Sequence, residues 1–353
     1  MLPLTLPLAP MLARSAATIP PGMAYEPKWD GWRVILARDG DDVRLWSRRG
    51  TELTAFFPEL VAAAADLPEQ CVLDGETVIV ADGRLEYTRL ASRHTTRADP
   101  QWLARQLPAT FIAFDLLALG DHSLLSQPWT ARRELLEVIL SDIEGPLALS
   151  PVTRDLELAQ RWFDEFEGAG LDGVVAKPLS STYEPGQRAV YKIKHRRTAD
   201  VVVAGFRHDR NTTATHRPLG SLLLGLFDDE DRLHFLGVCS GFANRIRQEL
   251  AAMLADLELP RGTPEWDQHP WAPRSARGAR VPDHVTSWRE PRDEVHLISP
   301  LLVAEVAYDY VHGAERFRSN ADFIRWRPDR DPLSCRFDQL DLVPAFDVRD
   351  LLA

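Results

Sequence analysis

The sequence contains very little lysine. Its 353 residues include 41 Lys and Arg, and the only lysines are Lys28, Lys177, Lys192 and Lys194. Arginine serves as well in an ion pair, but it keeps its proton near neutral pH, whereas a lysine amine can be tuned into a nucleophile. The four lysines are therefore candidates for amine chemistry or for point-charge contact with phosphate.

Cysteine and long apolar runs are also scarce. Cys71, Cys239 and Cys335 lie far apart without a CxxC pair, which argues against a disulfide framework or a structural zinc and fits a reducing cytosol. No apolar run approaches the roughly 18 residues that span a membrane, and the proline-broken N-terminus lacks the basic leader of a secretory signal. We expect a cytoplasmic protein without a membrane partner.

Neither GxxxxGK[ST] nor GxGxxG occurs, which sets P-loop and dinucleotide-binding folds aside. The net charge of -11 alone speaks against a nucleic-acid partner. However, the charge is segregated, and residues 188–200, 207–217, 274–280 and 316–330 are basic. A basic stretch is usually a solvated face, but several that converge in space can follow a phosphodiester backbone.

The first part of the chain has the pattern of an α+β domain. Residues 32–38 and 43–47 are apolar runs joined by an acidic turn, which predicts a β-hairpin. Further short segments rich in Val, Ile and Phe predict strands, and residues 131–140 and 155–170 predict helices. Mainly antiparallel sheets with helices are expected here.

The composition changes near Thr198. Beyond it come short apolar strands and a single helical pattern at residues 244–257, which is typical of a small Greek-key barrel of the OB type. The sequence therefore predicts two domains, residues 1–198 and 199–353.

Amines and carboxylates gather in a few short segments. These are Lys28, Asp30 and Arg33 in "KWDGWR", Asp74 and Glu76 in "LDGE", Asp172 and Lys177 in "DGVVAK", and Lys192 and Lys194 in "YKIK". The last two lysines share one face of a strand, since side chains two apart point the same way. An amine that can attack, amines for phosphate and carboxylates for Mg²⁺ together suit nucleotidyl transfer.

In this order the segments resemble the motifs of the covalent nucleotidyltransferases, and specifically the ATP-dependent DNA ligases of the short bacterial C type (LigC-like). The resemblance extends over almost the whole chain, from K-x-D-G-x-R at residues 28–33 to "RWRPDRDP" at residues 325–332. It implies an ATP-grasp-like adenylation (nucleotidyltransferase) domain followed by an OB-fold barrel. It also implies ATP and Mg²⁺ (or Mn²⁺) as cofactors and nicked double-stranded DNA as the substrate.

The resemblance implies a role for each matched residue. Lys28 would carry AMP, Phe114 would stack on adenine, and Glu76 and Asp172 would bind the metal. The implied nucleotide contacts are Glu26, Arg33, Arg48, Glu76, Phe114, Arg188, Lys192, Lys194 and Arg327. Without the resemblance, Phe114 would be expected to pack in the core, and Lys177 can also be read as a structural ion-pair partner.

Three positions depart from the family pattern. Asp172 stands where many ligases have Glu, and its side chain, shorter by one methylene, reaches Mg²⁺ if the strand lies closer to the metal. Arg330 ends the last motif in place of Lys, which suggests a charge contact to pyrophosphate rather than proton chemistry. Val190 replaces a frequent tryptophan and loosens the register around Arg188.

The implied mechanism has three phosphoryl transfers: AMP to Lys28, AMP to the 5′-phosphate at a nick, and attack by the 3′-hydroxyl. The resemblance implies a monomer active in repair, with repair polymerases or nucleases as partners, and a hinge at residues 195–200. A capping guanylyltransferase or an RNA ligase shares the lysine–nucleotide plan, and an inactive nick or single-strand binder could use the same barrel.

Overall fold

In the computed structural model, the chain forms two compact units. The structure describes all residues except 96–97, 196, 210–211, 214–216, 277, 283–293, 310, 313–315, 318, 341–345 and 352–353. The first unit comprises Met1–His195 and Val343–Ala353, and the second comprises Arg196–Leu342. This division differs from the predicted 1–198 and 199–353 because the last residues of the chain belong to the first unit.

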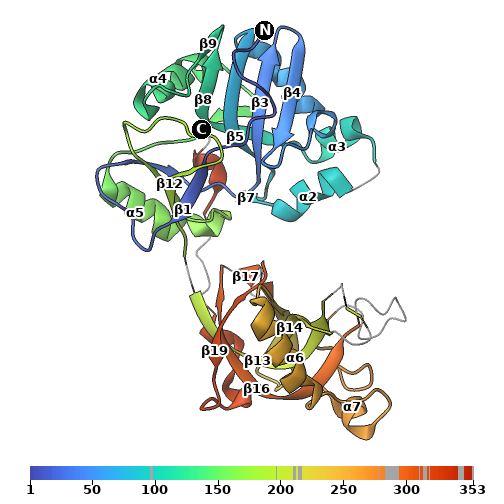
Figure 1. Ribbon diagram of the computed structural model, residues 1–353. Helices are drawn as coiled ribbons and strands as arrows, with labels where there is room; N and C mark the ends of the chain where they lie inside the picture. Colours follow the sequence, from blue (N-terminus) through green and yellow to red (C-terminus); the bar gives the residue numbers. More distant parts are fainter. Residues whose placement is uncertain are drawn as a thin grey trace. The chain divides into compact units, whose positions relative to one another are not determined.

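Two sheets form the first unit (Figure 1). The larger has the order β10-β8-β5-β3-β4, with β9 paired to β8, and the smaller has the order β1-β12-β11-β2. The larger sheet consists of β3 (Trp32–Asp39), β4 (Asp42–Ser47), β5 (Gln70–Val78), β8 (Thr110–Leu119), β9 (His122–Ser123) and β10 (Leu147–Leu149). The smaller consists of β1 (Leu12–Ser15), β2 (Ala24–Pro27), β11 (Val174–Lys177) and β12 (Arg188–Ile193). A separate two-stranded ribbon pairs β6 (Val80–Ala81) with β7 (Arg84–Leu85).

The predicted hairpin is confirmed: β3 and β4 pair antiparallel with Asp39 opposite Asp42 across the acidic turn. Most pairs are antiparallel, as expected, but β1 pairs with β12 and β10 with β8 in parallel. Apolar side chains of β3, β5 and β8 meet those of β1 and β12 in a core that includes Ile35, Val72 and Val190. This core holds the two sheets together.

Both helices predicted in the first part are confirmed. They are α4 (Trp129–Leu140), which packs against β8, and α5 (Leu156–Glu165), which covers the smaller sheet (Figure 1). Asp155 caps α5 by accepting a hydrogen bond from the Glu157 backbone N–H at 2.9 Å. Three further helices, α1 (Pro58–Ala63), α2 (Tyr87–Thr95) and α3 (Pro100–Gln106), were not predicted. Each has fewer than ten residues, too few for a clear helical period.

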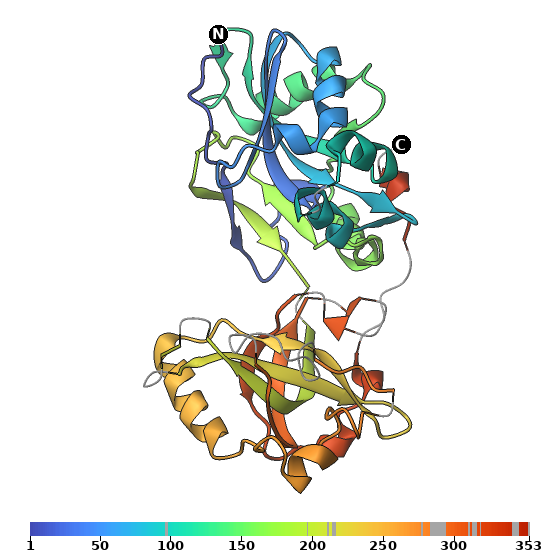
Figure 2. The same ribbon diagram turned by 90° about the vertical axis from the view of Figure 1, so that its right-hand side faces the viewer.

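The second unit contains a five-stranded antiparallel sheet with the order β15-β14-β13-β16-β19. A parallel bridge between Cys239 and Ala321 joins its two edges and closes it into the expected OB-type barrel. The strands are β13 (Arg197–His208), β14 (Leu219–Phe227), β15 (Leu233–Cys239), β16 (His296–Tyr308) and β19 (Asp322–Trp326), and a short ribbon pairs β17 (Val311–His312) with β18 (Arg316–Phe317). The predicted helix is α6 (Asn244–Ala255), seen beside the barrel in Figure 2, and a short second helix, α7 (Pro264–Gln268), accompanies it.

Cys71, Cys239 and Cys335 are buried free thiols. Within the described part of the chain, no helix has the length and apolar character needed to cross a membrane.

The end of the chain is anchored in the first unit. Val348 is fully buried, and its N–H donates to the Gly83 carbonyl at 2.7 Å. The ring of Phe346 lies 4.6 Å from that of Phe166. Buried apolar contact rather than chain order therefore assigns this segment to the first unit.

We predict that Val348→Ala lowers the free energy of unfolding of the first unit by roughly 1 to 3 kcal/mol, because it removes two buried methyl groups. Calorimetric thermal unfolding of the full chain measures this. The matched control is Arg349→Ala, an exposed neighbour whose loss should cost less than about 0.5 kcal/mol. Equal unfolding temperatures for the two variants would contradict the anchoring role of Val348.

Candidate active site

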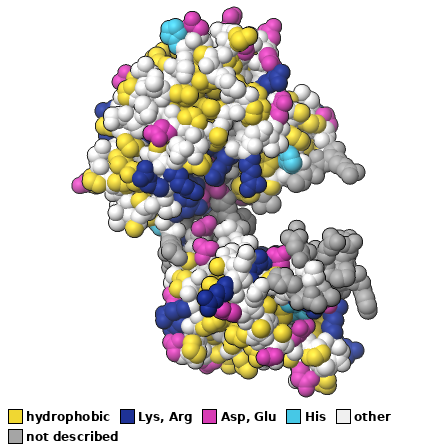
Figure 3. All heavy atoms as spheres, in the orientation of Figure 1, with side chains coloured by type: hydrophobic (Ala, Val, Ile, Leu, Met, Phe, Trp, Pro, Cys, Tyr) yellow, Lys and Arg dark blue, Asp and Glu magenta, His cyan; other side chains and the backbone are white. Residues whose placement is uncertain are grey.

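All four lysines of the chain line one cavity. The cavity has a volume of about 1070 Å³ and lies between the two sheets of the first unit. Its charged lining residues are Glu26, Lys28, Arg33, Arg48, Arg49, Glu76, Asp115, Lys177, Arg188, Lys192 and Lys194. Figure 3 shows Lys and Arg side chains gathered along one edge of the first unit. A cavity of this size and charge suits a polyanionic ligand.

Asp172 holds two lysines together inside this site. Its Oδ2 accepts from Lys28 Nζ at 2.7 Å and lies 2.8 Å from Lys194 Nζ. Burial acts to raise the pKa of Asp172, but the charges of Lys28 and Lys194 outweigh it and lower the pKa below its usual value. Asp172 is therefore an ionised carboxylate shared by two ammonium groups.

Backbone pairing explains why these groups meet. Lys28 directly follows β2, and Asp172 precedes β11, its antiparallel neighbour. The Lys28 N–H donates to Gly173 O at 2.8 Å, and the Asp172 N–H donates to Lys28 O at 2.9 Å. Gly173 has φ +122°, and a Cβ there would lie 2.1 Å from the Ile193 carbonyl oxygen, so only glycine fits.

A buried carboxylate positions Arg33. Asp74 accepts from Arg33 Nε at 2.8 Å and from Nη2 at 2.6 Å. Tyr183, a buried phenol from the loop before β12, also donates to Asp74 at 2.5 Å. Burial and the Asp74 charge raise the pKa of Tyr183, so its hydroxyl stays a donor. Sequence reasoning named Asp74 but gave no signal for Tyr183, which is 109 residues away.

Glu76 lies opposite Arg33 in the pairing of β3 with β5. Its Oε1 accepts from the Gly31 N–H at 3.0 Å. Burial raises the pKa of Glu76 to about 7, although Lys28 and Arg33 act in the opposite direction. The carboxyl therefore changes charge near neutral pH.

Phe114 is a partly exposed lining residue of β8 rather than a core side chain. Arg33 Cζ lies 4.9 Å and Lys177 Nζ 4.7 Å from the centre of its ring. Lys177 also pairs with Glu26 at 2.8 Å, so the structural ion pair considered from the sequence is present. Burial raises the pKa of Glu26 above its ordinary value, although Lys177 opposes this shift.

The remaining predicted residues of the first unit also line the cavity. Arg48 lies in the turn after β4, and Arg188 begins β12 and donates to Ala13 O at 2.7 Å. Partial burial and nearby cations lower the pKa of Lys192. His94, which no sequence motif singled out, also lines the cavity, with its ring 6.0 Å from that of Trp32.

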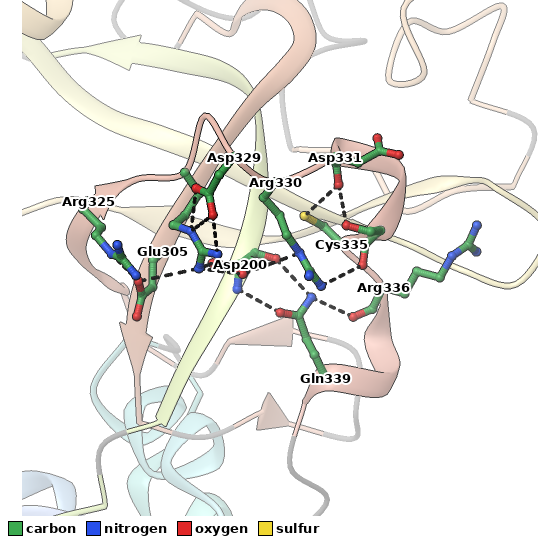
Figure 4. Close-up of polar contacts among 11 residues, drawn as sticks. Asp200, Glu305, Arg325, Asp329, Arg330, Asp331, Cys335, Arg336 and Gln339 are labelled. Atoms are coloured by element: carbon green, nitrogen blue, oxygen red, sulfur yellow. Dashed lines mark hydrogen bonds and ion pairs between the residues drawn. The ribbon is translucent and has the colours of Figure 1, made fainter.

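Arg327, like Arg330, is a predicted site residue of the second unit. Its guanidinium pairs with Asp200 at 3.0 Å and with Asp329 at 2.9 Å. Figure 4 shows the surrounding cluster of acids, arginines and Gln339. Arg330, which replaces the usual lysine, lies 3.6 Å from Asp200.

Within the described residues, no group of three or more His, Cys, Asp or Glu side chains forms a cage for a metal ion. Glu76 and Asp172, the predicted metal ligands, offer one carboxylate each. Such a donor set suits Mg²⁺, which usually takes one or two protein carboxylates and completes its shell with water and substrate phosphates.

A unit of mixed sheets followed by an OB-type barrel, with a cationic cavity lined by amines and carboxylates, is typical of nucleotidyltransferases. Residues 10–194 match the ATP dependent DNA ligase domain, and residues 215–330 match the ATP dependent DNA ligase C terminal region. The chain belongs to the ATP-dependent DNA ligase family.

Individual relatives agree with this assignment. The chain is 48% identical to DNA ligase C2 of Mycolicibacterium smegmatis, with 97% of each chain covered. It is 44% identical to DNA ligase C of Mycobacterium tuberculosis, with 99% of this chain and 98% of that one covered. Among solved structures, a Lig E DNA ligase shares the fold at 17% identity with a TM-score of 0.54, covering 90% of this chain and 99% of that one. The C-type resemblance inferred from the motifs is thus confirmed.

We predict a pH-dependent contribution of Glu76 to stability. Its pKa is raised from 4.5 to about 7 on folding, so its contribution is fully present below 4.5 and is lost as the pH rises through 7. Chemical unfolding of the wild type and Glu76→Gln, at about pH 5 and pH 8, measures this. We expect the wild type to lose about 1 to 2 kcal/mol relative to the variant over this range, after allowance for solvent screening.

Glu134→Gln, an exposed change on α4, is the control and should respond to pH as the wild type does. The same response in the wild type and Glu76→Gln would refute the assigned titration.

Proposed function

We propose that Lys28 is the nucleophile through which this ligase seals nicks in duplex DNA. In the first step, Lys28 Nζ loses a proton and forms a bond to the α-phosphorus of ATP, while the bond to the β-phosphate oxygen breaks and pyrophosphate leaves. In the second, a 5′-phosphate oxygen of the nick attacks the same phosphorus and releases the lysine. In the third, the 3′-hydroxyl attacks the 5′-phosphate, and AMP leaves as the phosphodiester forms.

The observation that carries this proposal is the position of Lys28. Its side chain is 20% exposed, and its amine lies beside Asp172 in a cavity that all four lysines line. The reaction of the family needs such an amine. An arginine at this position would carry the same charge without a lone pair to attack.

The other predicted residues take supporting roles. Lys192 and Lys194 would meet the α-phosphate, and Arg48 and Arg188 would contact the sugar and phosphates. Arg33 would contact the nucleotide or the nick, and Phe114 would stack on adenine. Glu76 would bind the ribose, with Glu26 held ready near the base by Lys177.

Mg²⁺ (or Mn²⁺) fits the same site, where Glu76 and Asp172 would hold it and it would neutralise phosphate charge. One oxygen of Asp172 already contacts the ammonium groups of Lys28 and Lys194, and a metal ion could replace one of these ammonium groups as its partner.

We further propose that the protein acts as a monomer in the cytoplasm, on nicks in the nucleoid, in DNA repair. The support is the C-type resemblance and a cysteine set that consists only of free thiols. Repair polymerases or nucleases that leave a 5′-phosphate beside a 3′-hydroxyl are the expected partners.

The first test is Lys28→Arg. We expect this variant to keep its fold and its ion pair with Asp172 and yet to take up no label from α-labelled ATP, because arginine lacks the lone pair. Autoradiography of the denatured protein, or a mass spectrum showing addition of one AMP, measures the adduct. The control is Arg44→Lys, an exposed change on β4, which should take up the label normally. A labelled Lys28→Arg chain would refute the assignment of Lys28 as the nucleophile.

A second test concerns Arg327, for which we propose a contact to the departing pyrophosphate. Arg327→Ala should slow adenylation by about 100-fold or more, as expected for loss of a charged donor at a reacting phosphate. It should leave the sealing of pre-adenylated nicks nearly unchanged, since pyrophosphate has no part in that step. Arg325→Ala, an exposed arginine two residues earlier, is the control. An equal loss in both assays would contradict this role.

A further inference from the structure

The guanidinium of Arg327 is held by carboxylates on two sides. Nη1 donates to both oxygens of Asp200 at 3.0 Å. Nε and Nη2 donate to Asp329 at 3.0 and 2.9 Å. A guanidinium has five N–H donors, so these four contacts leave one for another acceptor. Arg327 is thus both fixed and able to bind a phosphate.

The two carboxylates differ in what they can fix. Asp329 lies two residues from Arg327 and moves with the same segment. Asp200 lies 127 residues away on β13, the first strand of the barrel. The backbone N–H of Arg327 also donates to Val303 O on β16 at 2.8 Å. Asp200 is therefore the contact that orients the side chain relative to the barrel.

The backbone of Asp200 is held without help from its own carboxylate. The Asp200 N–H donates to Gln339 Oε1 at 2.8 Å, and Gln339 Nε2 donates to Asp200 O at 3.0 Å (Figure 4). The Asp200 side chain is mostly buried, at 15% exposure. Replacing it should therefore change the arginine more than the strand.

Asp200 also lies close to the second arginine of the motif. Its Oδ2 is 3.6 Å from Arg330 Nε, so one carboxylate lies beside both motif arginines. Opposite Asp200 on β16 lies Glu305, whose carboxylate accepts from Arg325 at 2.7 Å and is 3.9 Å from Arg327. Glu305 is a matched acid on the same sheet that pairs mainly with a different arginine.

We propose that Asp200 is a positioning residue for adenylation, which fixes the Arg327 guanidinium in one orientation before the triphosphate arrives. The proposal rests on the role given to Arg327 above. A side chain that is already ordered loses less rotamer freedom when its ligand binds, so the arginine acts at once on the leaving pyrophosphate. Asp200 itself touches no substrate.

The experiment compares Asp200→Ala, Asp200→Asn, Arg327→Ala, the double variant Asp200→Ala/Arg327→Ala and Glu305→Gln in the full chain. Single-turnover labelling with α-labelled ATP gives the rate and the half-saturating ATP concentration of adenylation. Sealing of a pre-adenylated nick gives the later chemistry. Thermal unfolding reports on the fold.

We expect Asp200→Ala to slow adenylation about 10- to 100-fold, the loss typical of a misplaced catalytic group, with sealing of the pre-adenylated nick within about 2-fold of the wild type. Asp200→Asn keeps an acceptor for Nη1 and should lose less. Glu305→Gln should stay within about 2-fold in both assays. The double variant should be no slower than Arg327→Ala, because a residue that acts only through Arg327 has no effect without it.

The alternatives overturn the proposal in distinguishable ways. If the loss of adenylation rate in the double variant equals the product of the losses in the two single variants, Asp200 has a structural role. Equal losses in adenylation and sealing by Asp200→Ala would mean the same. Faster adenylation by Asp200→Ala would mean that the carboxylate restrains Arg327. If Arg327→Ala adenylates normally, the role of Arg327 fails first, and that of Asp200 with it.

Discussion

The site depends on one carboxylate shared between two amines. Asp172 accepts from Lys28 and lies within ion-pair distance of Lys194, so two like charges are held close together where they would otherwise repel. The geometry follows from the pairing of β2 with β11 and from a glycine that no other residue can replace. An ammonium has no lone pair, so the proposed attack by Lys28 requires that its amine first lose a proton. A cation that took over Asp172, such as the proposed metal ion, would allow this.

Arginines and lysines divide the work in this protein. Arg33 and Arg327 are each fixed by an aspartate, Asp74 in the first unit and Asp200 in the second. The planar guanidinium forms bidentate pairs that hold it in one orientation, which suits a group that must present fixed donors. A lysine that forms a covalent bond to a nucleotide and later breaks it needs a single movable amine instead. All four lysines therefore lie in the cavity, whereas arginines lie both in the cavity and elsewhere in the chain.

Much of the fold and the site could be predicted from the sequence, and the parts that could not share a cause. The β3–β4 hairpin, α4, α5 and α6 follow from local periodicity and turn residues, which one segment carries by itself. The return of Val348 to the first unit, Tyr183 beside Asp74 and Asp200 beside Arg327 depend on contacts between segments about 109 to 265 residues apart, for which no local pattern exists. Motif residues, including Asp74 and Asp172, could be named in advance because their spacing is local, whereas Tyr183 and Asp200 contact the motif residues from distant segments and could not.

The net charge of -11 and a polyanionic substrate can be reconciled by the range of electrostatic interactions. At physiological ionic strength, charges farther apart than about 8 Å are largely screened, so a ligand responds mainly to the side chains around it. The cavity is lined by eight Lys or Arg and by three Asp or Glu, and one of those acids, Glu76, is partly protonated near neutral pH. Acidic turns such as that between β3 and β4 carry negative charge, but screening leaves only a weak repulsion between this charge and a triphosphate in the cavity. The local balance of charge in the cavity therefore decides what it binds, and this balance favours phosphates.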